Sequence, residues 1–155
     1  MAILASLFDV LRGWPKEGSI DESFTINQTT PGTDDSLPSG TVIYVTTTGT
    51  AAVATTPDRS SANAVATWVV VAGNDDFSSQ FVHKVVALRS NAMFKLDPSN
   101  FAAASYTIGQ KLTFSAGLWQ GATSHNQIIG EVVQNNIATD GTLVVEYTGG
   151  TDSSF

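Results

Sequence analysis

The last third of the chain, residues 106–148, contains three strand-like runs. These runs are KLTFSA, NQIIGEVVQ and TLVVEYT, and turns that contain glycine separate them. In the first run, Leu112 and Phe114 alternate with Lys111 and Thr113. A period of two residues is characteristic of a strand with one buried face. The most regularly patterned part of the chain therefore specifies β-structure.

Composition extends this expectation to the rest of the molecule. The chain has 155 residues, of which 42% are hydrophobic and only 14% are charged, and Val and Thr are abundant. The length fits one domain with a sizeable core, and β-branched residues favour strands. We predict an all-β fold, a small β-barrel or β-sandwich of about eight short strands, over residues 20–155.

The expected strands outside the C-terminal third are short and bounded by turn residues. They are residues 23–27, the two arms of a hairpin around Gly49 within residues 41–56, and residues 68–71, 81–89 and 93–96. The run WVVV at 68–71 is apolar throughout, which predicts a strand covered on both faces. Residues 101–105 (FAAAS) are expected to form a brief helical turn.

Residues 1–19 are predicted to be an N-terminal arm or a short amphipathic helix. Their apolar residues lie three and four apart, and they are Ile3, Leu4, Leu7, Phe8, Leu11 and Trp14. On a helix these side chains would share one stripe, which Pro15 would end. The stripe either binds a partner or packs on the chain's own barrel, and the pattern leaves both interpretations open. The polar face lacks the Lys and Arg enrichment of membrane-surface helices.

Charge and cysteine content exclude several classes of partner and site. The formal net charge is −7, and the seven Lys and Arg are dispersed, whereas nucleic-acid binding requires a basic patch. We therefore expect no direct nucleic-acid partner. The chain has no cysteine, so disulfides and thiolate metal sites are excluded. No apolar run is long enough to span a membrane, and the N-terminus lacks the basic region of a signal peptide. We expect a soluble protein, made in the cytoplasm, with no membrane partner.

The two histidines do not form a recognisable catalytic motif. His83 lies within an expected strand, and His125 lies in the loop GATSHNQ beside Ser124. Neither a G-x-S-x-G turn nor an H-E-x-x-H zinc motif is present. The hypothesis that the protein is a hydrolase rests on Ser124 and His125 alone. We expect no enzymatic activity, no catalytic residue, no cofactor and no metal site.

The acidic residues also need no metal-binding or catalytic role to explain them. Asp34 and Asp35 lie in a loop rich in Pro and Gly that lacks the regular oxygen ligands of a calcium site. Glu131 and Glu146 lie on expected strands, and a glycosidase would need two such carboxylates facing each other across a cleft. Both glutamates are explained more simply as strand residues whose carboxylates point outward into water.

Three aromatic residues offer an alternative function. Trp68, Trp119 and Tyr44 could line a sugar-binding face, although core packing is the commoner use of such residues. Trp119 lies in a turn expected at residues 117–121, where a large side chain would be partly exposed and could anchor a partner. With the low charge and the Thr-, Ser- and Asn-rich loops, this suggests a carbohydrate- or receptor-binding β-module of a phage fibre or adhesin.

The C-terminal pattern resembles a known family. The segments IGQKLTFSAGLW, IIGEVVQ and DGTLVVEY are similar to the end of tailed-bacteriophage capsid decoration (cement) proteins, in which such strands close a small β-barrel. The matching positions are Gly109, Leu112, Phe114, Gly130, Val132, Val133, Gly141, Leu143, Val145 and Tyr147. The resemblance extends over roughly residues 37–148 and is strong over about the last forty of these.

The resemblance implies a structural role in the virion. A cement protein binds the major capsid protein on the outside of a phage head and strengthens the shell. It also implies self-association, with a homotrimer favoured over a dimer, and an N-terminal arm that reaches neighbouring subunits. The expected partner-binding residues are therefore the apolar stripe of residues 1–14 together with Trp119.

Overall fold

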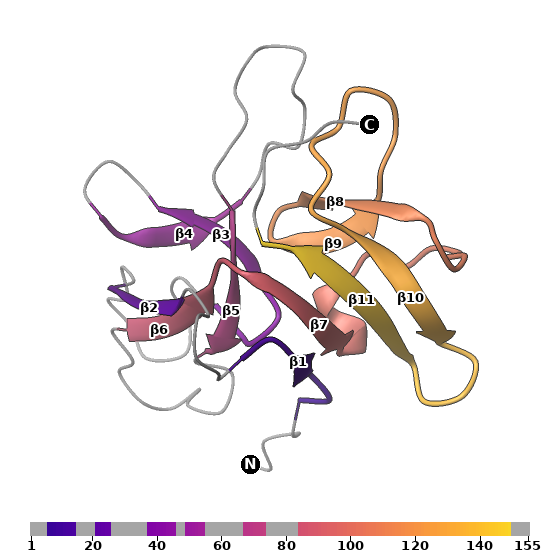
Figure 1. Ribbon diagram of the computed structural model, residues 1–155, viewed down its shortest axis with the longest axis horizontal. Helices are drawn as coiled ribbons and strands as arrows, with labels where there is room; N and C mark the ends of the chain where they lie inside the picture. The colour runs from indigo at the N-terminus through magenta and orange to yellow at the C-terminus, as the bar shows by residue number, and fades with distance from the viewer. Residues whose placement is uncertain are drawn as a thin grey trace.

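Two antiparallel sheets form the described part of the chain in a computed structural model (Figure 1). The structure describes residues 6–14, 21–25, 37–45, 49–54, 67–73 and 84–149. The six-stranded sheet has the order β1 (Asp9–Arg12), β7 (Asn91–Leu96), β11 (Thr142–Thr148), β10 (Gly130–Asn136), β8 (Lys111–Ser115) and β9 (Leu118–Gly121). The five-stranded sheet has the order β2 (Asp21–Thr25), β6 (Lys84–Leu88), β5 (Trp68–Ala72), β3 (Val42–Val45) and β4 (Ala51–Val53). The predicted all-β, sandwich-like fold is confirmed.

The three C-terminal runs form adjacent strands of the six-stranded sheet. β10 pairs with β11 on one side and with β8 on the other. Leu143, Val145 and Tyr147 of β11 are fully buried, as their alternation predicts. Gly130 begins β10 at a point where the backbones of β10 and β11 approach closely, since a Cβ there would lie 2.2 Å from the Glu146 carbonyl oxygen. The position admits only glycine without a shift of the backbone.

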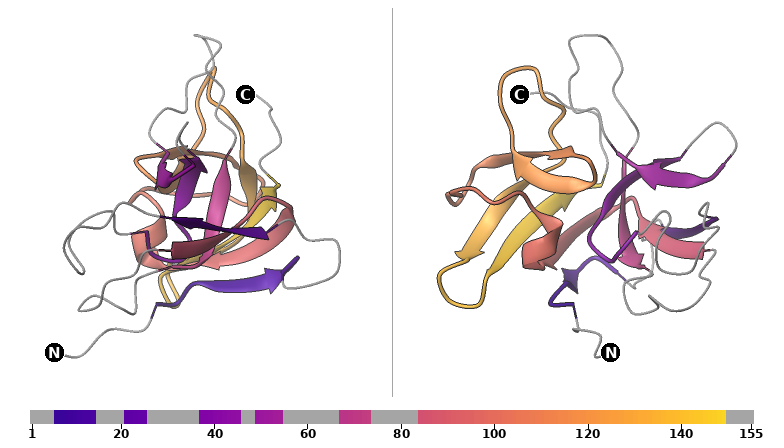
Figure 2. Two further views of the ribbon diagram at one scale, coloured as in Figure 1. Left: turned by 90° about the vertical axis from the view of Figure 1, so that its left-hand side faces the viewer. Right: turned by 180° about the vertical axis from the view of Figure 1, so that it is seen from behind.

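The main core lies between the two sheets. Its largest cluster combines Val42, Val69 and Leu88 of the five-stranded sheet with Phe94 and Tyr147 of the six-stranded sheet. β6 and β7 follow each other with only two residues between them, so the chain passes here from one sheet to the other (Figures 1 and 2). Burial of apolar surface on the facing sides is what holds the sheets together.

A second apolar cluster covers the other face of the five-stranded sheet. It contains Phe24, Leu37, Ile43, Ala51, Val70, Val85 and Ala87. Val70 belongs to this cluster, whereas its neighbours Val69 and Val71 belong to the main core. β5 is therefore covered on both faces, as the run WVVV predicts. The hairpin around Gly49 is also confirmed, because β3 and β4 pair with Val45 opposite Ala51.

The predicted helical turn at residues 101–105 is wrong. A short 3-10 helix, η1 (Pro98–Asn100), lies just before it, and Phe101 is extended and bridges to Trp119. The turn starts earlier because Asp97 caps it and Pro98 occupies its first position, where proline's fixed φ suits a helix start. No helix among the described residues has the length and hydropathy to cross a membrane.

Candidate functional site: the N-terminal edge and the outer face of the six-stranded sheet

The N-terminal segment contains an edge strand, β1. The sequence predicts either an arm or a short amphipathic helix for this segment. β1 pairs with β7, with Asp9 opposite Lys95, Val10 opposite Phe94 and Arg12 opposite Met93. Leu11 is the extra residue of a β-bulge in this pairing. The helical alternative is therefore wrong for Asp9–Arg12, which form an edge strand of the six-stranded sheet. Pairing with β7 and contact with the core outweigh the local helical spacing.

The predicted partner-binding residues of this segment divide into two groups. Phe8 and Trp14 are half-buried and pack against the main core, with the Phe8 ring 5.5 Å from that of Phe94. Leu7 and Leu11 are 43% and 47% exposed. Ile3 and Leu4 lie outside the described residues. Packing on the chain's own core is therefore confirmed for Phe8 and Trp14. Leu7 and Leu11 face solvent, and binding of a partner by the stripe remains a prediction.

Asp97 fixes the start of this segment to the body of the sheet. The Leu7 backbone N–H donates to Asp97 Oδ1 at 2.9 Å, and the Ser99 hydroxyl and N–H donate to Oδ2 at 2.6 and 2.9 Å. Partial burial of the Asp97 carboxyl raises its pKa, but the hydrogen bonds from Ser99 and Leu7 outweigh burial, so the pKa is lowered overall. The ionised carboxylate therefore favours the docked N-terminal segment.

Trp119 is buried, so its predicted exposure in a turn is wrong. Its side chain is 0% exposed, lies edge-on to Phe94 and Tyr147, and donates from Nε1 to the Gly40 carbonyl at 3.1 Å. The turn comprises only Ala116 and Gly117, which have φ of 50° and 80°. Such a two-residue turn starts β9 at residue 118 and places Trp119 opposite Phe114 on the inner face. Trp119 is a core residue and no anchor for a partner.

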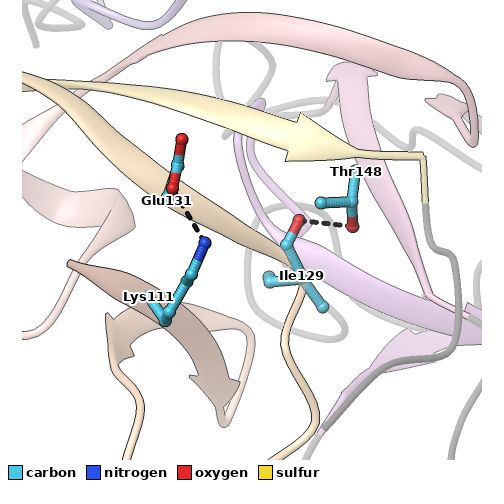
Figure 3. A network of polar contacts seen from close by, with 4 residues as sticks. All are labelled: Lys111, Ile129, Glu131 and Thr148. Atoms are coloured by element: carbon cyan, nitrogen blue, oxygen red, sulfur yellow. Dashed lines mark hydrogen bonds and ion pairs between the residues drawn. The ribbon is translucent and has the colours of Figure 1, made fainter. Parts of the chain in front are cut away.

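The outer face of the six-stranded sheet carries paired charges. Glu131 of β10 and Glu146 of β11 lie directly opposite each other. Lys111 Nζ lies 2.9 Å from Glu131 Oε2 (Figure 3), and Arg12 lies 3.5 Å from Glu146. The two glutamates do face the same way, as carboxylates of a catalytic pair would, but each is joined to a basic side chain.

An open hollow of about 390 Å³ lies beside these charges. It is lined by Asn91, Lys111, Ile128, Gly130, Glu131, Glu146, Tyr147 and Thr148. The Thr148 hydroxyl donates to the Ile129 carbonyl at 3.0 Å and so joins the end of β11 to the segment before β10 (Figure 3). Amide, ammonium and carboxylate groups together can donate to and accept from a small polar ligand. Sequence reasoning missed this hollow because it depends on the register of β8, β10 and β11.

The predicted aromatic sugar-binding face does not form. Trp68 packs against the second cluster, where it lies edge-on to Phe24 with ring centroids 4.9 Å apart. Tyr44 packs against the main core, to which Trp119 belongs. The three aromatic side chains are therefore divided between opposite sides of the five-stranded sheet.

The predicted hydrolase residues lie on an exposed turn. Ser124 Oγ is 3.2 Å from His125 Nδ1, and His125 has a φ of 70°. Among the described residues, no three His, Asp or Glu side chains come together as they would around a metal ion. His83, Asp34 and Asp35 lie outside the described residues.

Comparison of the chain with known protein families, with curated proteins and with solved structures finds no match in any of the three.

Proposed function

We propose that the protein is a capsid decoration protein, which binds the major capsid protein on the outside of a tailed-phage head and stabilises the shell. Two features support this role. The strands whose sequence pattern resembles that family, β8, β10 and β11, are neighbours in one sheet. The N-terminal segment is an extended edge strand, as expected for a segment that contacts neighbouring subunits. The proposed location is the virion exterior, after synthesis in the host cytoplasm.

The observation that carries the proposal is the exposure of Leu7 and Leu11. They are two of the exposed large apolar residues of the described chain, and they lie on a segment that hydrogen bonds and core packing hold in place. Covering such side chains with a partner is favourable because it removes apolar surface from water. A shell offers many equivalent positions, so a modest contact at each one is sufficient to stabilise the assembly.

Mixing the purified chain with undecorated heads tests this function. The heads would be assembled from a tailed-phage major capsid protein without any decoration protein. We expect saturable co-sedimentation, and we expect the double substitution Leu7→Ser/Leu11→Ser to weaken binding roughly 10- to 100-fold. Leu7 and Leu11 are 43% and 47% exposed, so covering both contributes just under half of the value for two fully buried leucines, about 1.4–2.8 kcal/mol in total.

A matched control is Ile108→Ser/Ile137→Ser, which removes two exposed apolar side chains from turns elsewhere. This control should bind as the unaltered chain does. Absence of co-sedimentation by the folded, unaltered chain refutes the proposed function. Equal binding by both double variants would leave the function standing and move the contact away from β1.

The outer-face hollow favours a second candidate, a carbohydrate- or receptor-binding module of a phage fibre or adhesin. Its Asn91, Lys111 and Glu131 side chains offer donors and acceptors of the kind that sugar hydroxyl groups need. A glycan array tests this candidate. It predicts a hit that Glu131→Gln weakens, and an array without hits would count against it.

A further inference from the structure

The edge strand β1 is paired on one side only within the described part of the chain. Its neighbour is β7, and the six-stranded sheet ends with β1. The strand is solvent-accessible, since Asp9, Leu11 and Arg12 are all exposed. An open edge presents backbone N–H and C=O groups that can pair with a further strand.

The bulge in β1 brings two opposite charges onto one face. Asp9 lies opposite Lys95 and Arg12 lies opposite Met93, and both of these β7 residues alternate with the buried Phe94. Asp9 and Arg12 therefore both face outward, although they are three residues apart. In a regular strand, residues three apart would face opposite sides.

We propose that β1 pairs antiparallel with β1 of a second copy of this chain, about a twofold axis. In the register we infer, Asp9 lies opposite Arg12 of the second copy, and Val10 lies opposite Leu11 of the second copy. The twofold axis generates each contact twice. The two six-stranded sheets become one continuous twelve-stranded sheet.

Charge complementarity identifies a second copy as the occupant of this edge. The strand reads acidic, apolar, apolar, basic, so reversing its direction aligns unlike charges at both ends. A parallel arrangement would instead align Asp9 with Asp9, which is unfavourable. Arg12 already lies 3.5 Å from Glu146, but a guanidinium has five N–H donors and can serve two carboxylates. The Asp9 carboxylate forms no ion pair with a basic side chain among the described residues.

The size of the contact determines how the dimer behaves. Four residues on each side form a small interface, below the roughly 1,200–2,000 Å² of a typical stable complex. The dimer is therefore in concentration-dependent equilibrium with the monomer. A twofold contact closes after two copies, which gives a dimer where the family resemblance favours a homotrimer.

Sedimentation equilibrium of the full chain over a wide concentration range, without heads, tests this pairing. We expect a monomer–dimer equilibrium. Asp9→Arg and Arg12→Asp should each weaken the dimer roughly 10-fold or more, because both symmetric contacts become repulsive. The double substitution Asp9→Arg/Arg12→Asp should restore dimerisation, since it exchanges the two charges.

The double substitution separates pairing between copies from effects within one chain. Within one chain it sets an aspartate beside Glu146 and an arginine beside Lys95, so purely internal effects predict that it is at least as damaging as either single change. Near-ultraviolet circular dichroism establishes that each variant is folded. A monomer at all concentrations, a trimer mass, or no recovery in the double variant would overturn the proposal. Because the measurement uses no heads, its outcome is independent of the capsid-binding test.

Discussion

Trp119 connects the two sheets at the level of single side chains. Its ring contacts Phe94 and Tyr147 in the main core, and its Nε1 satisfies the Gly40 carbonyl, which lies just before β3. Tyr147 makes a similar connection, because its hydroxyl donates to the Thr67 carbonyl at 3.0 Å, just before β5. Buried polar groups on aromatic residues generally need such partners. These two residues combine the largest buried rings with hydrogen bonds between the sheets.

Replacing Trp119 should therefore be among the most destabilising single changes. We expect Trp119→Ala to lower the free energy of unfolding by about 3–5 kcal/mol, because it leaves a cavity in the core. Trp119→Phe keeps a ring but leaves the Gly40 carbonyl without its donor, so it should cost less, about 1–3 kcal/mol. Urea denaturation measures both. A loss below about 1 kcal/mol for Trp119→Ala would contradict a core position for this residue.

Ala116 has a backbone conformation that suits another residue better. Its φ of 50° lies in the left-handed region, which costs an alanine roughly 1–2 kcal/mol. Asn-Gly is a preferred pair for two-residue turns of this kind, so Ala116→Asn should stabilise the protein by about 1 kcal/mol. The control is Ala104→Asn, at an exposed position without positive φ. Equal thermal midpoints for the two variants would refute strain at Ala116.

The residue scale also explains why the sequence misplaces Trp119. Alternation correctly assigns Leu112 and Phe114 to the core. The pair Ala116-Gly117 lacks the asparagine or aspartate that usually identifies a two-residue turn, so the turn is predicted too long and absorbs the start of β9. With the turn placed at residues 116 and 117, the same alternation would have predicted a buried Trp119.

At the scale of elements, the docking of the N-terminal segment depends on pH through Asp97. The pKa of Asp97 is lower in the folded chain than its usual value. Its contribution to stability is therefore fully present above the unfolded-state pKa, about 3.9, and is lost as pH falls through the folded-state pKa. Neutral pH lies well inside the stabilised range.

Removing the Asp97 carboxylate should destabilise the protein at neutral pH but not in acid, where the carboxylate of the unaltered chain is protonated. We expect Asp97→Ala to lower the free energy of unfolding by about 1 kcal/mol at pH 7, the usual cost of losing a cap, with solvent exposure keeping the loss small. The difference from the unaltered chain should shrink as the Asp97 carboxylate becomes protonated. Urea denaturation at a series of pH values measures this difference in the free energy of unfolding. A difference that stays constant down to the lowest pH would contradict the stabilising role of the Asp97 carboxylate.

The elements differ in how far the sequence predicts them. Alternation over several residues specifies β8 and β11, and the apolar run that ends in Val132 and Val133, bounded by turns that contain glycine, indicates β10. β1 was open to two predictions, since a bulged strand and a helix both accommodate apolar residues three and four apart. Only pairing with β7, which is more than seventy residues away in the chain, decides between them. The division at residue 19 between an arm and a domain remains a prediction, and β1 itself is part of the six-stranded sheet.

At the scale of the whole molecule, strand order could not be predicted from the chain. β7 lies between β1 and β11, and these neighbours come from opposite ends of the sequence. The outer-face hollow depends on this order and on the register that sets Glu131 opposite Glu146. Composition predicts the all-β class, but long-range pairing decides which side chains meet.

We propose that this two-sheet protein decorates a phage head. The most direct measurement is the number of copies bound per undecorated head as a function of protein concentration, determined by co-sedimentation. We expect saturation at a fixed ratio of chain to major capsid protein, because equivalent sites on a symmetric shell fill to a limit. Failure of the folded chain to bind, or binding that rises without saturation, would contradict it.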